Sequence, residues 1–163
     1  MIDDNFIAIA VCIEPSCLNN PVAFTDGSFA SINNWNWNFG DGSTSTLRNP
    51  SHTYTTVGRF NVTLTITTAS GCSRSVTYNQ YIRAGEKPTV EFTGTPRQTC
   101  LFFPVSFTDQ SSPADFWFWQ FGDGGTSSAQ NPSHTYTTPG IYTARLQVTT
   151  NTGCVDSTSL IIT

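Results

Sequence analysis

Hydrophobic and polar residues alternate along several short stretches of the chain, and one such stretch occurs twice. From Trp35 to Phe39, and again from Trp117 to Phe121, aromatic residues fall on every second position. A β-strand turns alternate side chains to opposite faces, so each stretch predicts a strand with one buried aromatic face. The residues predicted for the core of the two copies are Trp35, Trp37, Phe39, His52, Tyr54, Trp117, Trp119, Phe121, His134 and Tyr136.

Each aromatic strand is followed by Gly-Asp-Gly and then by Asn-Pro-Ser-His-Thr-Tyr, which begins at Asn49 and at Asn131. Glycine reaches positive φ at little cost and Asp bonds its own backbone, so Gly-Asp-Gly predicts a tight turn. These motifs resemble the polycystic kidney disease (PKD) domain, with its signature W-x-F-G-D-G and N-P-x-H-x-Y. The resemblance implies an all-β fold of two tandem immunoglobulin-like (PKD-type) β-sandwich domains, residues 1–84 and 85–163.

Further strands follow from the same periodicity. Residues 21–26 and 104–109 repeat one another, and so do the longer alternating stretches 60–67 and 142–149. The polar, glycine-containing segments 69–71 and 151–153 predict hairpin turns. Residues 83–88 read as a short, proline-ended linker between the copies, which favours a semi-rigid pair with a modest interface.

Residues 5–12 predict the first strand, but this strand is apolar on both sides. Its second face would carry Ala8, Ala10 and Cys12. A strand that is apolar on both faces is either covered on both or is an edge open to another chain. The two interpretations, extra packing inside the first domain and a contact with a partner, are both open.

Composition narrows the class of partner. Charged residues make up 11% of the chain, the formal net charge is −4, and Lys and Arg form no cluster. Nucleic acid and anionic membranes attract basic patches, so neither is an expected partner. No apolar run reaches the length of a membrane span, and residues 1–5 lack the features of a signal peptide. A surface rich in Thr, Ser and Asn, together with five cysteines, favours a secreted or cell-surface protein.

No residue pattern predicts catalysis. The two histidines, His52 and His134, occupy the same place in each copy, and an active site is rarely duplicated intact in so small a chain. We expect structural roles, with the imidazoles bonding backbone near the Gly-Asp-Gly turns. The chain has no nucleophile motif, phosphate loop or His/Cys cluster with metal spacing, so the prediction is a non-enzyme without a cofactor.

Four aspartates recur in register and are expected to cap turns. They are Asp26, Asp41, Asp109 and Asp123. The resemblance to PKD domains keeps calcium as an alternative, since some relatives bind it through carboxylates near strand ends. Calcium needs six to eight oxygens, and no dense acidic loop is present, so Asp26 and Asp109 are weak candidates.

The copies differ where four asparagines become four phenylalanines. Asn19, Asn20, Asn34 and Asn36 of the first copy correspond to Phe102, Phe103, Phe116 and Phe118 of the second. Alternation turns Phe116 and Phe118 away from the core, and contiguous exposed aromatic residues usually mark a contact site. For Phe102 and Phe103 the alternative is that they turn into the end of the sandwich.

Three functions are compatible with these observations. The favoured one is an extracellular structural or adhesive protein that associates head-to-tail with itself into a filament or array, because a contact between two different surfaces propagates unless it closes. The second is a module that binds carbohydrate or other surface proteins, with Phe116 and Phe118 stacking on a polysaccharide. The third is an inert spacer from a larger secreted protein.

The cysteines allow two pairing schemes. Symmetry pairs Cys17 with Cys72 and Cys100 with Cys154, but in an immunoglobulin-like sandwich the members of each pair lie at opposite ends. A disulfide holds its Cα atoms about 4.4 to 6.8 Å apart. This objection favours a bridge of Cys17 with Cys154 between domains, with Cys72 and Cys100 left to link successive molecules. Cys12 is then either a buried thiol or a further link.

Overall fold

The computed structural model describes residues 16–28, 31–98 and 102–163, and the regular structure in these ranges is entirely β-strand. The chain divides into two compact units, Met1–Gly85 and Glu86–Thr163. The predicted all-β class and the tandem arrangement are therefore confirmed. The predicted first strand, with Ala8, Ala10 and Cys12, lies outside the described residues, as does Cys100. Within the described ranges, no helix is long and apolar enough to cross a membrane.

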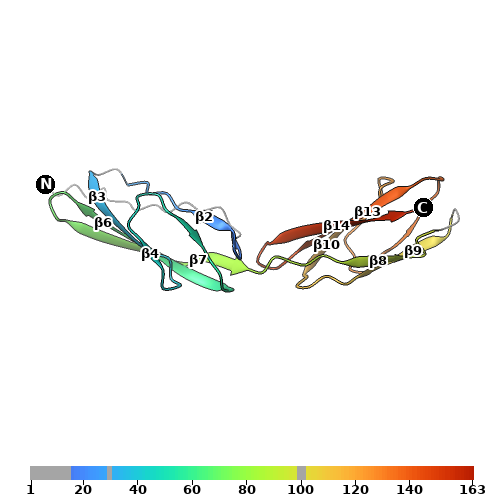
Figure 1. Ribbon diagram of the computed structural model, residues 1–163, viewed down its shortest axis with the longest axis horizontal. Helices are drawn as coiled ribbons and strands as arrows, with labels where there is room; N and C mark the ends of the chain where they lie inside the picture. The colour runs from blue at the N-terminus through green and yellow to red at the C-terminus, as the bar shows by residue number, and fades with distance from the viewer. Residues whose placement is uncertain (1–15, 29–30, 99–101) are drawn as a thin grey trace. The chain divides into compact units, whose positions relative to one another are not determined.

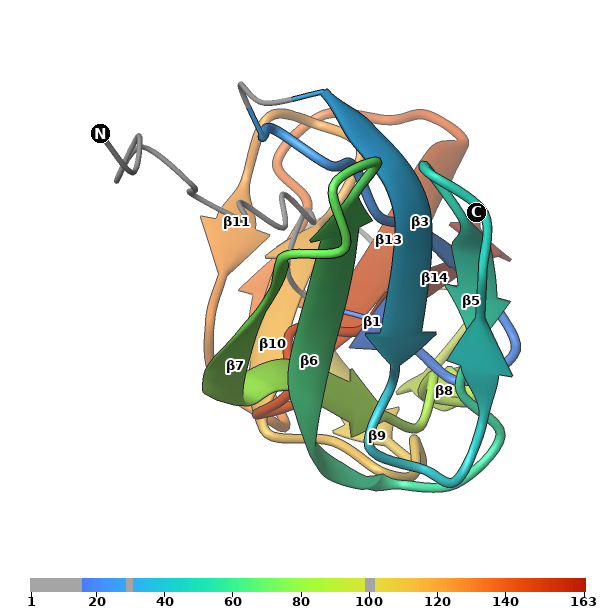
Figure 2. The same ribbon diagram turned by 90° about the vertical axis from the view of Figure 1, so that its left-hand side faces the viewer.

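The first domain consists of two sheets that face each other across a core (Figures 1 and 2). One sheet has the order β1-β7-β6-β3-β4, and Figure 2 shows β7, β6 and β3 side by side; the other pairs β2 with β5. The strands are β1 (Ser16–Cys17), β2 (Pro21–Ala23), β3 (Ile32–Asn38), β4 (Thr44–Ser45), β5 (Ser51–Thr53), β6 (Gly58–Thr68) and β7 (Ser73–Gly85).

The second domain repeats this plan. One sheet has the order β11-β10-β13-β14, and the other has the order β12-β9-β8. The strands are β8 (Phe92–Thr95), β9 (Pro104–Asp109), β10 (Phe116–Gln120), β11 (Thr126–Ser127), β12 (Ser133–Thr135), β13 (Tyr142–Thr149) and β14 (Val155–Ile162).

Strand β6 follows the predicted alternation. Val62, Leu64 and Ile66 point into the core and are fully buried. The threonines between them face outward, where their hydroxyls bond hydroxyls of β7, as in the pair Thr65 and Ser75 at 2.6 Å. Burying three branched side chains on one face stabilises the sheet by roughly 1.5 to 3 kcal/mol each.

The aromatic strands β3 and β10 bury the predicted Trp and Phe side chains, except that the first Trp of each strand is only partly buried. Trp37 and Trp119 are completely buried, and the following Phe39 and Phe121 are nearly so. The first Trp of each strand is only partly buried: its ring packs against the core, and its indole N–H donates to Asp26 or Asp109. The indole therefore packs its ring against the core and keeps a polar edge outside it.

The connection between the domains is shorter than the six residues predicted. Residues 83–85 continue β7, because Ala84 and Gly85 pair in parallel with β1 while Arg83 and Ala84 pair with the start of β6. The boundary between the compact units falls between Gly85 and Glu86.

Candidate functional site

The Gly-Asp-Gly turn of each domain holds a histidine through its aspartate. In the first domain Asp41 accepts a hydrogen bond from Ser43 N–H at 2.9 Å, and its second oxygen lies 2.7 Å from Nε2 of His52. Asp123 does the same with Gly125 and His134, at 2.9 and 2.7 Å. The prediction that each imidazole bonds backbone is therefore wrong, since its partner is the carboxylate of the turn.

The packing of the His52 ring explains why the imidazole meets the carboxylate of the turn. The ring of His52 stacks on Phe39, with centroids 4.2 Å apart, and meets Tyr54 edge-on at 4.7 Å. This packing leaves one edge of the imidazole directed at the turn between β3 and β4. The pair of His52 with Asp41 consequently ties that turn to β5 in the opposite sheet, which is a structural role.

The electrostatics of the turn agree with a structural role. Burial on its own raises the pKa of the Asp41 carboxyl, but the hydrogen bonds from Ser43 and His52 outweigh it and leave that pKa below its ordinary value. The same balance, with His134 and Gly125 as donors, lowers the pKa of Asp123. Both carboxylates are thus held ionised by the groups that they cap.

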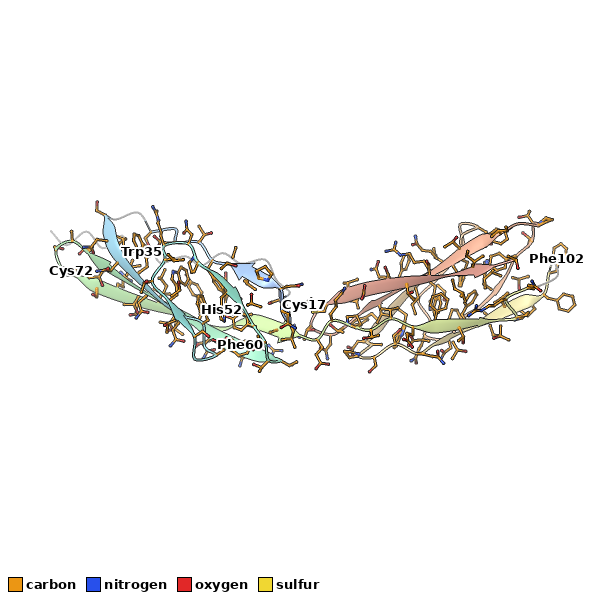
Figure 3. The ribbon with its side chains drawn as sticks, viewed as in Figure 1. Cys17, Trp35, His52, Phe60, Cys72 and Phe102 are labelled. Atoms are coloured by element: carbon orange, nitrogen blue, oxygen red, sulfur yellow. The ribbon has the colours of Figure 1, made fainter. Side chains whose placement is uncertain are left out.

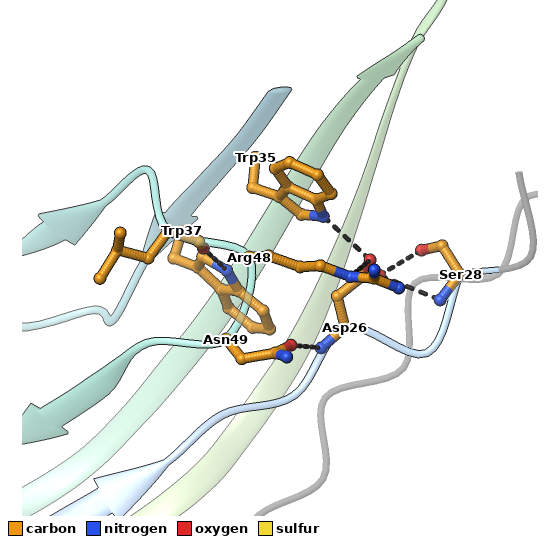
Figure 4. Close-up of polar contacts among 7 residues, drawn as sticks. Asp26, Ser28, Trp35, Trp37, Arg48 and Asn49 are labelled. Carbon is orange, nitrogen blue, oxygen red and sulfur yellow. Dashed lines mark hydrogen bonds and ion pairs between the residues drawn. The ribbon is translucent and has the colours of Figure 1, made fainter. Parts of the chain in front are cut away.

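A second shared network centres on Asp26 (Figure 4). One carboxylate oxygen accepts hydrogen bonds from the backbone N–H and the hydroxyl of Ser28. The other accepts the indole N–H of Trp35 at 2.9 Å and lies 3.5 Å from Nε of Arg48. The side chain of Asp26 is only 1% exposed, so these donors replace its hydration.

The second domain builds the same network around Asp109, with one replacement. The carboxylate accepts the indole N–H of Trp117 at 2.6 Å and the N–H of Ser111 at 3.0 Å. Gln130 contributes an amide N–H at 3.3 Å where the first domain uses the guanidinium of Arg48. Both aspartates therefore cap loops and anchor the first Trp of the aromatic strand.

Hydrogen-bond donors surround the carboxylates of Asp26 and Asp109. Calcium takes oxygen ligands, whereas N–H and O–H donors point at these carboxylates. In the part of the chain that the structure describes, no group of three or more His, Cys, Asp or Glu residues could hold a metal ion. A calcium site at these two residues stays a prediction.

All four phenylalanines that replace asparagines are exposed. Phe116 and Phe118 are 63% and 44% exposed and point outward from β10, as the alternation predicted. Phe102 and Phe103 are 69% and 64% exposed, so the alternative that they turn into the end of the sandwich is wrong.

The four rings do not form one contiguous patch, which corrects the prediction. Phe102 precedes β9 and donates its N–H to Tyr136, whose ring stacks on Tyr142 at the start of β13. Phe116 lies on β10 in the other sheet and pairs with Thr149 at the end of β13. These two ends of β13 are about 23 Å apart at about 3.3 Å per residue. The second domain therefore has two separate aromatic surfaces.

The first of these, the tip surface, comprises Phe102, Phe103 and Ile141 and lies at the end of the domain where β13 starts (Phe102 in Figure 3). Ile141 is 76% exposed and immediately precedes β13. The sequence analysis did not single out Ile141 as a contact residue. Its counterpart in the first copy is Arg59, and this exchange of a charged for an apolar residue was a usable signal.

The second, the sheet surface, is the outer side of β10, β13 and β14. Phe116 and Phe118 stand opposite Thr149 and Gln147 on β13. Arg145, on the same side of β13, donates a hydrogen bond to the Ser157 hydroxyl of β14 at 2.9 Å. The polar neighbours of the two rings were also missed, because alternation assigns a face but not the strand that lies beside it.

The cysteines exclude one pairing scheme. Cys72 is free and exposed, whereas Cys17 and Cys154 are each disulfide-bonded, so the pairing of Cys17 with Cys72 is wrong. Figure 3 shows Cys17 and Cys72 at opposite ends of the first domain, and the 13 residues of β7 separate them. The bridge of Cys17 with Cys154 stays a prediction.

Both halves of the chain match the same family of known protein domains. A family model described as the PKD domain matches residues 12–84 and 85–162. The PKD1 domain of Vibrio anguillarum Epp is 30% identical over 47% of this chain and 90% of that one, with a TM-score of 0.41. The PKD1 domain of the Vibrio cholerae metalloprotease PrtV is 28% identical over 47% and 94%, with a TM-score of 0.40.

A more distant similarity covers nearly the whole chain. The fibronectin(III)-like modules of Clostridium thermocellum CbhA are 14% identical over 94% of this chain and 93% of that one, with a TM-score of 0.57. Identity this low reflects a shared fold alone.

Proposed function

Because the chain belongs to the PKD-domain family, as two tandem copies, we propose that it is a non-catalytic extracellular module that associates with further copies of itself through the tip surface of its second domain. The hydroxyl-rich composition, in which only 11% of residues are charged, and the disulfide-bonded cysteines support an extracellular setting. The duplication of the His and Asp pairs in structural positions supports the absence of catalysis.

The observation that carries the self-association is the backbone of Phe102. Its φ is +68°, and the equivalent Asn19 of the first domain has a φ of +65°. Asparagine tolerates this left-handed conformation, whereas a bulky side chain there costs roughly 1 to 2 kcal/mol. The second domain thus keeps a strained Phe that is 69% exposed and adds nothing to its own core. Strain at an exposed apolar residue supports a role in contact.

The contrast between the copies supports a head-to-tail arrangement. The positions equivalent to Phe102, Phe103 and Ile141 in the first domain are Asn19, Asn20 and Arg59. The tip surface is therefore present on one domain only. In the arrangement that we propose, it meets a different surface on the next molecule. Such a heterologous contact produces open filaments when its rotation does not close into a ring.

Sedimentation velocity over a range of protein concentrations tests this function. We expect the wild type to form larger species as concentration rises, and we expect Phe102→Asn with Phe103→Asn to remain monomeric because it restores the residues of the first copy. Phe116→Asn with Phe118→Asn serves as the matched control and should assemble like the wild type. A wild type that stays monomeric at millimolar concentration, or a tip variant that still assembles, contradicts the proposal.

A further inference from the structure

The sheet surface presents two aromatic rings in a row. Phe116 and Phe118 lie on alternate residues of β10, so their rings project from the same side of the sheet about 6.6 Å apart. Gln120 continues the row along the strand and is also exposed. Two rings followed by an amide thus form a linear track along β10.

Polar side chains border this track on the neighbouring strand. Gln147 stands directly opposite Phe118, and Arg145 stands opposite Gln120. The guanidinium of Arg145 is held by its hydrogen bond to Ser157, so it lies across the sheet. Amide groups both donate and accept hydrogen bonds, and the guanidinium donates them. The surface therefore combines apolar ring faces with adjacent hydrogen-bonding groups.

The first domain shows that the fold does not need the rings. Asn34 and Asn36 occupy the same places on β3, and they pair with Thr67 and Thr65 of β6. Both asparagines are exposed, and the threonine hydroxyls beside them already bond hydroxyls of β7 at 2.8 and 2.6 Å. A sandwich of this kind is thus complete with amides at these two positions, and the exchange for phenyl rings points to binding.

The size of the surface argues against a stable protein partner. Strands about 4.8 Å apart that contain 5, 8 and 8 residues cover about 330 Å², which is less than half of the roughly 800 Å² that each partner buries in a standard interface. Arg145 is the one formally charged residue among the outward positions of β10, β13 and β14 in this part of the structure. Little charge and a narrow track favour a neutral, elongated ligand.

We propose that the sheet surface binds a neutral polysaccharide. A pyranose ring has an apolar C–H face and equatorial hydroxyls, which match ring faces flanked by amides. The C–H faces of consecutive sugars stack on Phe116 and Phe118, and their hydroxyls bond Gln120 and Gln147. The chain of sugars runs along β10. This site is independent of the tip surface and of self-association.

Binding to insoluble polysaccharides is the direct test. The whole protein is mixed with cellulose, chitin and, as an acidic comparison, calcium alginate gel, and the protein left in solution is measured. We expect cellulose or chitin to retain the wild type and alginate not to do so. Phe116→Asn with Phe118→Asn should reduce retention at least tenfold. Phe102→Asn with Phe103→Asn should not change it, so a failure of self-association and a failure of sugar binding are distinguishable.

Two further measurements exclude trivial explanations. Phe116→Tyr with Phe118→Tyr keeps the rings and should retain binding, which separates loss of stacking from loss of folding. Cellohexaose and chitohexaose, added to the labelled wild type, should shift NMR signals of β10 and β13 and leave those of the first domain unchanged.

Three outcomes overturn the proposal. The first is a wild type retained by neither cellulose nor chitin, together with an NMR spectrum unchanged by either hexasaccharide. The second is full retention of the Asn variant. The third is loss of self-association in that variant without any sugar, since a second copy of the chain is then the occupant.

Discussion

Gly40 and Gly42 lie on either side of Asp41, and both have positive φ, at 84° and 95°. A Cβ added at Gly40 would lie 2.4 Å from the carbonyl oxygen of Asn61, whereas one added at Gly42 would meet nothing within 4 Å. A substitution at Gly42 therefore tests backbone strain alone, whereas one at Gly40 tests strain together with steric overlap.

We expect Gly42→Ala to destabilise the first domain by about 1 to 2 kcal/mol, which is the cost of a left-handed alanine. Gly40→Ala should cost a further 1 to 3 kcal/mol or so, because the backbone of β6 must move away. Denaturant unfolding of the two variants measures the difference. Equal losses would show that the turn does not press against β6.

Asp41 and Asp123 make the stability of each domain depend on pH. Because the pKa of each carboxyl is lowered in the folded state, its contribution is fully present above the ordinary value of 3.8 and is lost as pH falls through the lowered value. Asp41→Asn should therefore be less stable than the wild type near neutral pH and lose less stability on acidification. Urea unfolding of the first domain between pH 7 and pH 2 tests this. Parallel curves for wild type and variant would contradict it.

The sequence predicted the shared core residues but not the bonds between them. Alternation assigns Phe39 and the strand of His52 to the interior, yet it does not say which atom of the turn meets the imidazole. Asp41 and His52 are 11 positions apart, and so are Asp123 and His134. Two polar residues repeated at one spacing were a usable signal for a direct pair.

At the scale of the strand, Trp37 and Trp119 are the best test of the sandwich. Each is completely buried, and each indole N–H donates to a backbone carbonyl, at Leu47 and Ala129. Replacing either with Ala leaves a large cavity and an unpaired carbonyl, so we expect a loss of about 3 to 5 kcal/mol. Chemical denaturation followed by NMR should show that only the mutated domain unfolds early. A loss below about 1 kcal/mol would contradict the burial of the strand.

Strand pairing was predictable from the alternating pattern, but its irregularities were not. In the first domain the register between β6 and β7 shifts after Phe60, where Gln80 has a φ of +50° and donates its N–H to Asn61. A period of two gives no sign of such a bulge. The same limit explains the divided aromatic surface, because periodicity turns Phe116 outward on its strand but does not say that Phe102, in the turn before β9, lies at the other end of β13.

At the scale of the whole molecule, the two domains share a scaffold and differ in what they expose. The His and Asp pair of the turn, at 2.7 Å, recurs in both copies, and so does the hydrogen bond from a Tyr hydroxyl to the carbonyl of Phe39 or Phe121, at 3.0 Å. The exchanges of asparagine for phenylalanine fall on the tip and sheet surfaces, where the side chains are exposed. The two copies therefore differ in exposed side chains while they share the same buried core.

The cysteines provide the last prediction. Cys72 is an exposed free thiol in the hairpin turn between β6 and β7, so it should react with iodoacetamide in the native protein. Cys17 and Cys154 are disulfide-bonded and should react only after reduction. Digestion of the alkylated protein without reductant, followed by mass spectrometry, shows whether Cys72 is alkylated and whether Cys17 and Cys154 are not.

The same peptide map tests the bridge between the domains. In the first domain Cys17 lies at the end where the chain leaves, since Leu18 donates its N–H to Gly85. In the second domain Lys87 forms an ion pair with Asp156 at 3.1 Å, which places Cys154 near the end where the chain enters. We therefore expect one linked peptide that contains Cys17 and Cys154. A peptide that links Cys17 to Cys12 or Cys100 would falsify the bridge, and a link to Cys72 would also contradict the free thiol of that residue.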